Sequence, residues 1–208
     1  FDLDGTLVDS VGDIHAALNK MLARTGHGPL GKDTVTRFVG KGSSNLVKRA
    51  IDHVGLPNDA ASHTHYLREF LNIYTSAPAK FTTVFDQVHE VLTDLQLSGI
   101  ALGLCTNKPE EAAAVVLKEF GLTAFFGSIV GGDRLPSRKP DPAMLYLVMK
   151  ELGVERCLFV GDSEVDVATA KAAGVPIAIF TRGYRQTHLV DMAADYNFDS
   201  FNELQAIA

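Results

Sequence analysis

The C-terminal half of the chain alternates short apolar runs with amphipathic stretches, and this feature restricts the possible folds most strongly. Apolar runs at 100–105 and 157–160 precede stretches of helical spacing at 109–120 and 165–173. Strands that alternate with helices predict a parallel sheet covered by helices on both faces. We therefore expect an α/β fold with a Rossmann-like parallel sheet core.

Capping signals mark where these helices begin and end. Asp141-Pro142 predicts a helix start with Asp141 as the N-cap, and residues 200–203 read as a capping box for a last helix. A left-handed residue is favoured where a helix ends, and glycine accepts this conformation most easily. Four glycines follow helical stretches, namely Gly99, Gly121, Gly153 and Gly174.

The segment from about residue 10 to residue 79 has helical spacing and no β-rich run. Its apolar faces are marked by Ala17, Leu18, Met21, Leu22 and by Leu67, Phe70, Leu71, Tyr74. Pro78 and Thr82-Thr83 predict a return linker, after which apolar positions from Val84 to Leu95 predict a core helix.

This pattern predicts a helical domain inserted into the α/β core. We expect residues 1–11 and 80–208 to form the core domain and residues 12–79 to form a helical cap domain.

Composition narrows the class of partner. The chain has 208 residues, 46% hydrophobic, and a net charge of -6. An acidic surface argues against nucleic acid or an anionic membrane as partner. The apolar runs are shorter than the ~20 residues that span a bilayer. With these partners disfavoured, we expect a small-molecule partner. Cys105 and Cys157 lie far apart in apolar runs, which predicts two free thiols and a cytoplasmic protein.

Two carboxylates stand two positions apart at the start of the chain, in the run Asp2-Leu3-Asp4-Gly5-Thr6. In an extended segment, residues i and i+2 point to the same side, so both carboxylates can face one reacting group. This arrangement suits a nucleophile and a proton donor. Because almost no strand precedes Asp2, we expect native residues before Phe1.

Three further polar segments follow predicted strands or precede predicted helices. They are Thr106-Asn107, Lys139-Pro140 and Gly161-Asp162-Ser163-Glu164-Val165-Asp166. Each has a simpler interpretation as a helix cap or a solvated basic loop. However, the carboxyl ends of parallel strands meet at one edge of a sheet, where ligands bind. Asp2, Asp4 and Asp162 would repel one another at this edge unless a lysine and a cation such as Mg²⁺ were present.

These four segments resemble, in order and across nearly the whole chain, the motifs of haloacid dehalogenase superfamily phosphatases with a helical cap. The resemblance is closest to phosphoglycolate phosphatases, through residues 1–10, 38–42 and 161–174. It implies a Mg²⁺-dependent hydrolase of a small phosphorylated metabolite, 2-phosphoglycolate above all.

The resemblance also implies roles for individual residues. Asp2 would attack phosphorus and form an aspartyl-phosphate, and Asp4 would act as general acid and base. Thr106, the Asn107 backbone and Lys139 would hold the phosphoryl group. Asp2, the Asp4 carbonyl and Asp162 would bind Mg²⁺. Three residues would support this site: Gly5 and Thr6 would shape the turn, and Asp166 would steady Lys139 or the metal's water shell.

Two other functions stay open at the level of sequence. One is phosphotransfer between sugar hydroxyls, as in β-phosphoglucomutase. The other is a phosphate-binding protein without turnover. The candidate nucleophile argues against this function, because binding alone does not need one. No coiled-coil seam is evident, and both a monomer and a homodimer are compatible with the sequence.

Overall fold

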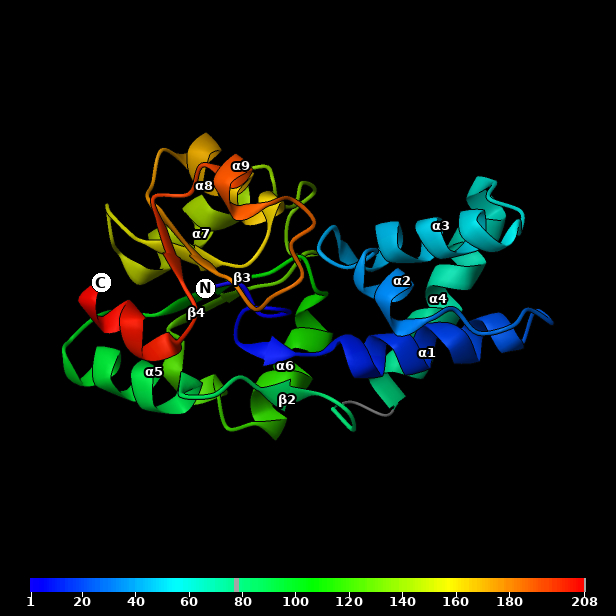
Figure 1. Cartoon of the computed structure of the whole chain (residues 1–208), viewed down its shortest axis with the longest axis horizontal. Coiled ribbons are helices and arrows are strands. Elements are labelled where there is room, and N and C mark those ends of the chain that lie inside the picture. The colour runs from blue at the N-terminus through cyan, green and yellow to red at the C-terminus, as the bar shows by residue number, and fades with distance from the viewer. Residues whose placement is uncertain (77–78, 208) are drawn as a thin grey trace.

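The computed structural model describes residues 1–76 and 79–207, and within them the protein has two lobes (Figure 1). One lobe is an α/β core, and the other is built from helices that come early in the chain. The predicted fold class is confirmed. Pro78, which we expected in the return linker, lies outside the described residues.

The core contains two groups of parallel strands. β3 (Gly103–Cys105) pairs with β4 (Ser128–Val130), and β5 (Phe159–Gly161) pairs with β6 (Ile177–Phe180), which pairs with β7 (Tyr196–Phe198).

The first two residues of the chain lie between these groups. Phe1 donates its terminal amine to the Gly103 carbonyl at 2.8 Å and accepts from the Cys105 amide at 2.8 Å. On the other side, the Asp2 amide donates to the Val160 carbonyl at 2.8 Å. Residues 1–2 therefore occupy the position of a central strand, and Asp2 lies between the carboxyl ends of β3 and β5.

Helices cover both faces of this sheet. They are α5 (Val88–Leu97), α6 (Glu110–Glu119), α7 (Ala143–Leu152), α8 (Glu164–Ala173) and α9 (Leu189–Met192), with short 3₁₀ helices η1 (Thr123–Phe125) and η2 (Phe201–Ala206). Neighbouring strand residues alternate between two hydrophobic clusters, as the two-residue period of a strand requires. Leu104 and Val160 pack with α5, α6 and η2, whereas Cys105 and Phe159 pack with α7 and α8.

The second lobe, the cap lobe, contains α1 (Val11–Ala23), α2 (Lys32–Thr36), α3 (Gly42–Val54) and α4 (Ala60–Ser76). Its helices enclose a hydrophobic cluster that is separate from the two clusters of the core lobe. Most residues of the two predicted apolar faces lie in this cluster, and Leu67 and Leu71 pack against it half-buried. In Figure 1 this lobe stands beside the core, so that it faces the edge of the sheet where the strands end.

A short antiparallel pair joins the two lobes. β1 (Val8–Asp9) pairs with β2 (Thr83–Val84). Thr83 was expected in a linker and Val84 at the start of a helix, but this helix, α5, begins only at Val88. Beside the strand pair, the buried carboxylate of Asp13 in α1 accepts hydrogen bonds from the amides of Phe81 and Thr82 and from the Thr82 hydroxyl, at 2.6–3.0 Å. The chain thus leaves and re-enters the core through one hydrogen-bonded hinge.

The predicted helix boundaries are close to those observed. Gly99, Gly121, Gly153 and Gly174 all have positive φ, between 67° and 78°, as predicted for residues that end a helix. Helix α7 begins one residue later than predicted, with Pro142 at the cap position, and Asp141 accepts from the Ala143 amide.

The last helix differs from the prediction more clearly. The capping box at Ser200 and Glu203 is present, but it opens a six-residue 3₁₀ helix. Within the described residues, no helix combines the length and the apolar character that crossing a bilayer requires.

Candidate active site

Asp2, Lys139 and Asp166 form a buried charged chain at the carboxyl edge of the sheet. Lys139 Nζ lies 2.9 Å from Asp2 Oδ1 and 2.7 Å from Asp166 Oδ1. Burial alone would lower the pKa of Lys139, but the carboxylates of Asp166 and Asp2 outweigh this effect and raise it. Lys139 therefore stays a cation beside the Asp2 carboxylate.

Asp162 lies next to this chain, at the C-terminal end of β5. It accepts from the Thr6 hydroxyl at 2.8 Å and from the Tyr184 amide at 2.6 Å. One carboxylate oxygen from each of Asp2, Asp162 and Asp166 can be chosen so that all three lie within 4.8 Å of one another.

This cluster carries more negative than positive charge. Burial raises the pKa of Asp2 to about 6, although Lys139 opposes the rise. Burial, together with the carboxylates of Asp166 and Asp2, raises the pKa of Asp162 well above its ordinary value. Three carboxylates share one ammonium, and a divalent cation would compensate the excess charge. The donor set therefore fits a hard cation that prefers oxygen ligands.

Asp166 already accepts several hydrogen bonds from other residues of the protein. Besides Lys139, it accepts from the amides of Asp162 and Ser163 at 3.2 and 3.1 Å and from the Ser163 hydroxyl at 2.7 Å. Burial acts to raise the pKa of Asp166, but Lys139 and these donors lower it. Its contacts suit a residue that fixes Lys139 and the start of α8, and they leave Asp2 and Asp162 as the better metal ligands.

Asp4 occupies a different environment from Asp2. Its carboxylate accepts from the Ser10 hydroxyl at 2.5 Å and from Lys108 Nζ at 2.8 and 3.1 Å. It is half-buried and lines the same cavities as Asp2. The two carboxylates therefore have separate lysine partners, which suits two different chemical roles.

Gly5 makes the turn after Asp4 possible. Its φ is +89°, which side chains rarely accept, and a Cβ at this position would lie 2.5 Å from Asp162 Oδ2. The following residue, Thr6, donates to the Asp162 carboxylate. The predicted turn residues thus set the distance between the first motif and Asp162.

Thr106 and Asn107 follow β3 and are buried at the same edge. The Asn107 side-chain amide donates to the Gly40 carbonyl of the cap lobe and to the Lys139 carbonyl, both at 3.0 Å. Its side chain therefore ties the cap lobe to the loop of Lys139. The Thr106 hydroxyl lines the cavity with Asp2 and accepts from the Lys108 amide at 3.2 Å.

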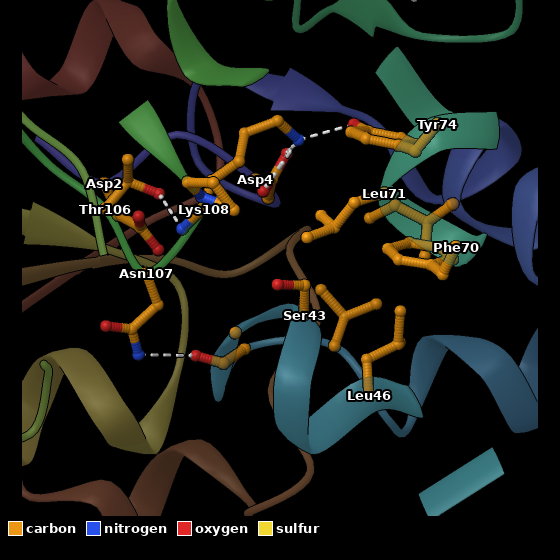
Figure 2. A pocket seen from close by; sticks show the side chains of 15 residues that line it. Asp2, Asp4, Ser43, Leu46, Phe70, Leu71, Tyr74, Thr106, Asn107 and Lys108 are labelled. Carbon is orange, nitrogen blue, oxygen red and sulfur yellow. Dashed lines mark hydrogen bonds and ion pairs between the residues drawn. The ribbon is translucent and has the colours of Figure 1, made fainter. Parts of the chain in front are cut away.

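Two cavities open onto these residues, and both are lined by Asp2, Asp4, Val39 and Gly40. The smaller, of about 50 Å³, is also lined by Thr106, Asn107, Lys108, Ile14, Leu46, Phe70, Leu71 and Tyr74. The wider, of about 540 Å³, includes Asp162, Lys41, Arg49 and Tyr184. Figure 2 shows the smaller cavity between the core residues Thr106, Asn107 and Lys108 and the cap residues Phe70, Leu71 and Tyr74.

Four residues in or beside the site were not predicted as site residues from the sequence, namely Lys108, Ser10, Tyr74 and Tyr184. The Tyr184 hydroxyl donates to Asp9 and accepts from the amides of Ser10 and Val11, so it braces the chain after the first motif. Lys108 had a usable signal, because it directly follows Thr106-Asn107 at a strand end.

Comparison with known proteins gives concordant results. Residues 1–180 match the sequence profile of the haloacid dehalogenase-like hydrolases. A phosphoglycolate phosphatase of Cereibacter sphaeroides is 43% identical over 205 residues, which cover 99% of this chain and 94% of that protein. One from Rhodospirillum rubrum is 43% identical over 98% of this chain and 87% of its own length.

Solved structures agree in fold. The crystal structure of a predicted phosphoglycolate phosphatase from Haemophilus somnus superposes with a TM-score of 0.93 at 30% identity, covering 100% of this chain and 95% of that one. CbbY from Rhodobacter sphaeroides, in complex with xylulose-(1,5)-bisphosphate, gives a TM-score of 0.82 at 22% identity, covering 98% and 94% of the two chains. This second likeness concerns the fold alone.

Proposed function

The chain belongs to the haloacid dehalogenase-like hydrolase family, and we propose that it is a Mg²⁺-dependent phosphatase whose substrate is 2-phosphoglycolate. One observation carries the proposal. The Asp2 carboxylate is paired with buried Lys139 and clustered with Asp162 at the edge of the sheet where the strands end. This arrangement gives a nucleophile, a fixed positive charge and a place for a cation around one phosphoryl group.

Asp2 is the proposed nucleophile. One of its carboxylate oxygens attacks phosphorus, and the bond between phosphorus and the ester oxygen breaks as the aspartyl-phosphate forms. Asp4 gives its proton to the departing oxygen, and in the second step it takes a proton from the water that attacks the aspartyl-phosphate. Phosphate is released and both carboxyl groups return to their starting states.

Lys139 and Thr106 hold the phosphoryl group in this scheme. The Lys139 ammonium balances the negative charge on the phosphoryl oxygens, and it needs no rearrangement because Asp166 already fixes it. The Thr106 hydroxyl and the backbone of Asn107, both at the end of β3, donate to the phosphoryl oxygens. Their position on a strand end keeps these donors rigid.

The proposed metal ligands are the carboxylates of Asp2 and Asp162 and the carbonyl of Asp4. Mg²⁺ prefers few carboxylates together with water and phosphate oxygens, and when bound it neutralises charge on the phosphoryl group. The crowded, buried carboxylates of Asp2 and Asp162 support this choice. Gly5, through its tight turn beside Asp162, and Thr6, through its hydrogen bond to Asp162, hold the first motif next to this carboxylate.

The proposed substrate follows from the relatives and from the size of the cavity. The two relatives reported above, each 43% identical, are named phosphoglycolate phosphatases. A space of about 50 Å³ beside Asp4 suits a short leaving group. The free thiols of Cys105 and Cys157 favour a reducing compartment, and we place the protein in the cytoplasm.

We propose that residues 12–79 form the cap domain and that residues 1–11 and 80–208 form the core domain. The hinge between β1 and β2 supports these limits, because the chain leaves and re-enters the core there. The smaller cavity lies between the two domains, so the cap is the part that chooses the leaving group.

A phosphate-release screen tests the proposal. The purified protein is incubated with Mg²⁺ and, separately, 2-phosphoglycolate, a sugar phosphate, a nucleotide or pyrophosphate. We expect 2-phosphoglycolate to give the highest kcat/KM and EDTA to abolish release, with recovery when Mg²⁺ is restored. A tenfold preference for another phosphoester would contradict the proposed substrate, and undiminished release in EDTA would contradict the metal requirement.

A further inference from the structure

Lys108 makes an unusual set of contacts at the border of the two domains. Its ammonium lies 2.8 and 3.1 Å from the two carboxylate oxygens of Asp4 and donates to Tyr74 Oη of the cap at 2.5 Å. It also stands 4.7 Å from the centre of the Tyr74 ring, a cation–π contact. Figure 2 shows the Lys108 side chain reaching from the core toward Tyr74, with Asp4 beside its ammonium.

The ammonium of Lys108 is buried and keeps its positive charge. The side chain is 3% exposed. Burial would lower the pKa of Lys108, but the Asp4 carboxylate and the Tyr74 hydroxyl raise it instead. Among the described residues that line the smaller cavity, Lys108 carries the single cationic side chain.

Tyr74 adds a second polar group to the same place. In the hydrogen bonds of the described residues, Tyr74 Oη appears only as an acceptor, from Lys108. Its own proton is therefore available to a ligand in the cavity. The ammonium of Lys108 and the hydroxyl of Tyr74 together form a recognition point for a negatively charged oxygen.

This recognition point lies where the leaving group must be. In the proposed mechanism Asp4 donates its proton to the ester oxygen. The ester oxygen must therefore bind beside the carboxyl group of Asp4, which Lys108 contacts directly. The cap side of the smaller cavity is mostly apolar, with walls from Ile14, Leu46, Phe70 and Leu71. Its volume of about 50 Å³ holds roughly three to five water-sized groups. A methylene and a carboxylate together have four non-hydrogen atoms.

We propose that Lys108, assisted by the Tyr74 hydroxyl, is the residue that selects a leaving group with a carboxylate one carbon from the ester oxygen. The inference rests on the proposed phosphatase function and adds the residue that recognises the carboxylate of the leaving group. Phosphate monoesters of short 2-hydroxy acids are the substrate class that this arrangement accepts. While Asp4 carries the proton that it donates, the Lys108 ammonium has no carboxylate partner unless the leaving group supplies one, and uncharged esters are therefore disfavoured.

The test compares two esters that share one two-carbon skeleton, 2-phosphoglycolate and ethyl phosphate. We measure kcat/KM for both with the wild type, Lys108→Gln, Lys108→Arg, Lys41→Gln and Lys48→Gln. Lys48 is exposed on α3 and pairs with Asp52, so its variant is the matched control for removing one lysine charge. Thermal unfolding of each variant establishes that it is folded.

We expect the wild type to prefer 2-phosphoglycolate by a factor on the order of 10². In Lys108→Gln this preference should shrink at least tenfold, whereas Lys108→Arg should retain most of it and Lys48→Gln all of it. An unchanged preference in folded Lys108→Gln overturns the inference. So does loss of the preference in Lys41→Gln, because Lys41 lines the wider cavity and not the smaller one.

A second measurement on the wild type is independent of how any variant folds. Moving the carboxylate one methylene farther away, in 3-phosphooxypropionate, should lower kcat/KM at least tenfold. Equal rates for all three esters overturn the inference but leave the phosphatase function standing. Failure to hydrolyse any of them, with Mg²⁺ present, overturns both.

Discussion

Lys139 Nζ lies 2.9 Å from Asp2 Oδ1, and the side chains of the two residues are 1% and 11% exposed. The pair joins the loop before α7 to the central strand position of the sheet. In the proposed reaction this ammonium would lie beside the phosphoryl group, and Asp166 contacts it at 2.7 Å. The proposed nucleophile, its cationic neighbour and the carboxylate that fixes this neighbour are thus in consecutive contact.

Replacement of the proposed acid and base should slow turnover without preventing phosphate from binding. For Asp4→Asn we expect kcat to fall by about 10²–10⁴, the usual contribution of a positioned proton donor and acceptor. Steady-state kinetics with 2-phosphoglycolate measure the loss. Inhibition by inorganic phosphate is the control and should persist, since Thr106 and Lys139 are intact. A loss smaller than tenfold would remove Asp4 from its proposed role.

A side chain at residue 5 should damage the site by displacing Asp162. The Cβ of Gly5→Ala would stand 2.5 Å from Asp162 Oδ2 at a φ of +89°. A displacement of about 1 Å at a reacting centre costs on the order of 10² in rate, and we expect at least that loss in kcat/KM. Gly28→Ala is the matched control, because Gly28 has no neighbour within 4 Å of a new Cβ. Equal activity of the two variants would refute this explanation.

The hinge carboxylate should contribute to stability. Asp13→Asn weakens the hydrogen bonds that join α1 to the amides of Phe81 and Thr82, and we expect the free energy of unfolding to fall by about 2 kcal/mol. Chemical denaturation measures the change. Asp33→Asn, at an exposed position on α2, should change it by less than about 0.5 kcal/mol. If both variants unfold alike, the hinge contacts do not stabilise the protein.

Reactivity of Cys105 should depend strongly on pH. Burial raises the pKa of this thiol to about 11, against a smaller opposing effect of Lys139. A raised pKa moves the thiolate, which is the reactive form, to higher pH. Alkylation by iodoacetamide, followed by peptide mass spectrometry, should therefore be slow at pH 7 and accelerate up to pH 10. Modification at pH 7 as fast as that of free cysteine would contradict the burial of this side chain.

The sequence was informative where chemistry follows strand ends. Asp2, Asp162 and Thr106 come from remote segments, yet parallel strands end at one edge, and this topology alone predicts that they meet. The alternation of strands and helices and the glycines after the helices likewise follow from local rules.

Other features depend on contacts that local patterns do not encode. Nothing in the periodicity of residues 60–76 distinguishes Tyr74 from an ordinary core residue, although its hydroxyl reaches Lys108. The inward direction of Lys108 depends on Asp4, far away in the sequence. Thr83–Val84 becomes a strand only because Val8–Asp9 is beside it, and local patterns did not reveal this non-local pairing, since they predicted a linker at Thr83 and a helix from Val84.

The most direct test of the site compares phosphate release from 2-phosphoglycolate by the wild type and by Asp2→Asn, with Mg²⁺ present. Circular dichroism verifies that the variant is folded. We predict that Asp2→Asn releases no phosphate above the uncatalysed background, because its amide cannot form the aspartyl-phosphate. Phosphate release by folded Asp2→Asn at the wild-type rate would show that Asp2 is not the nucleophile.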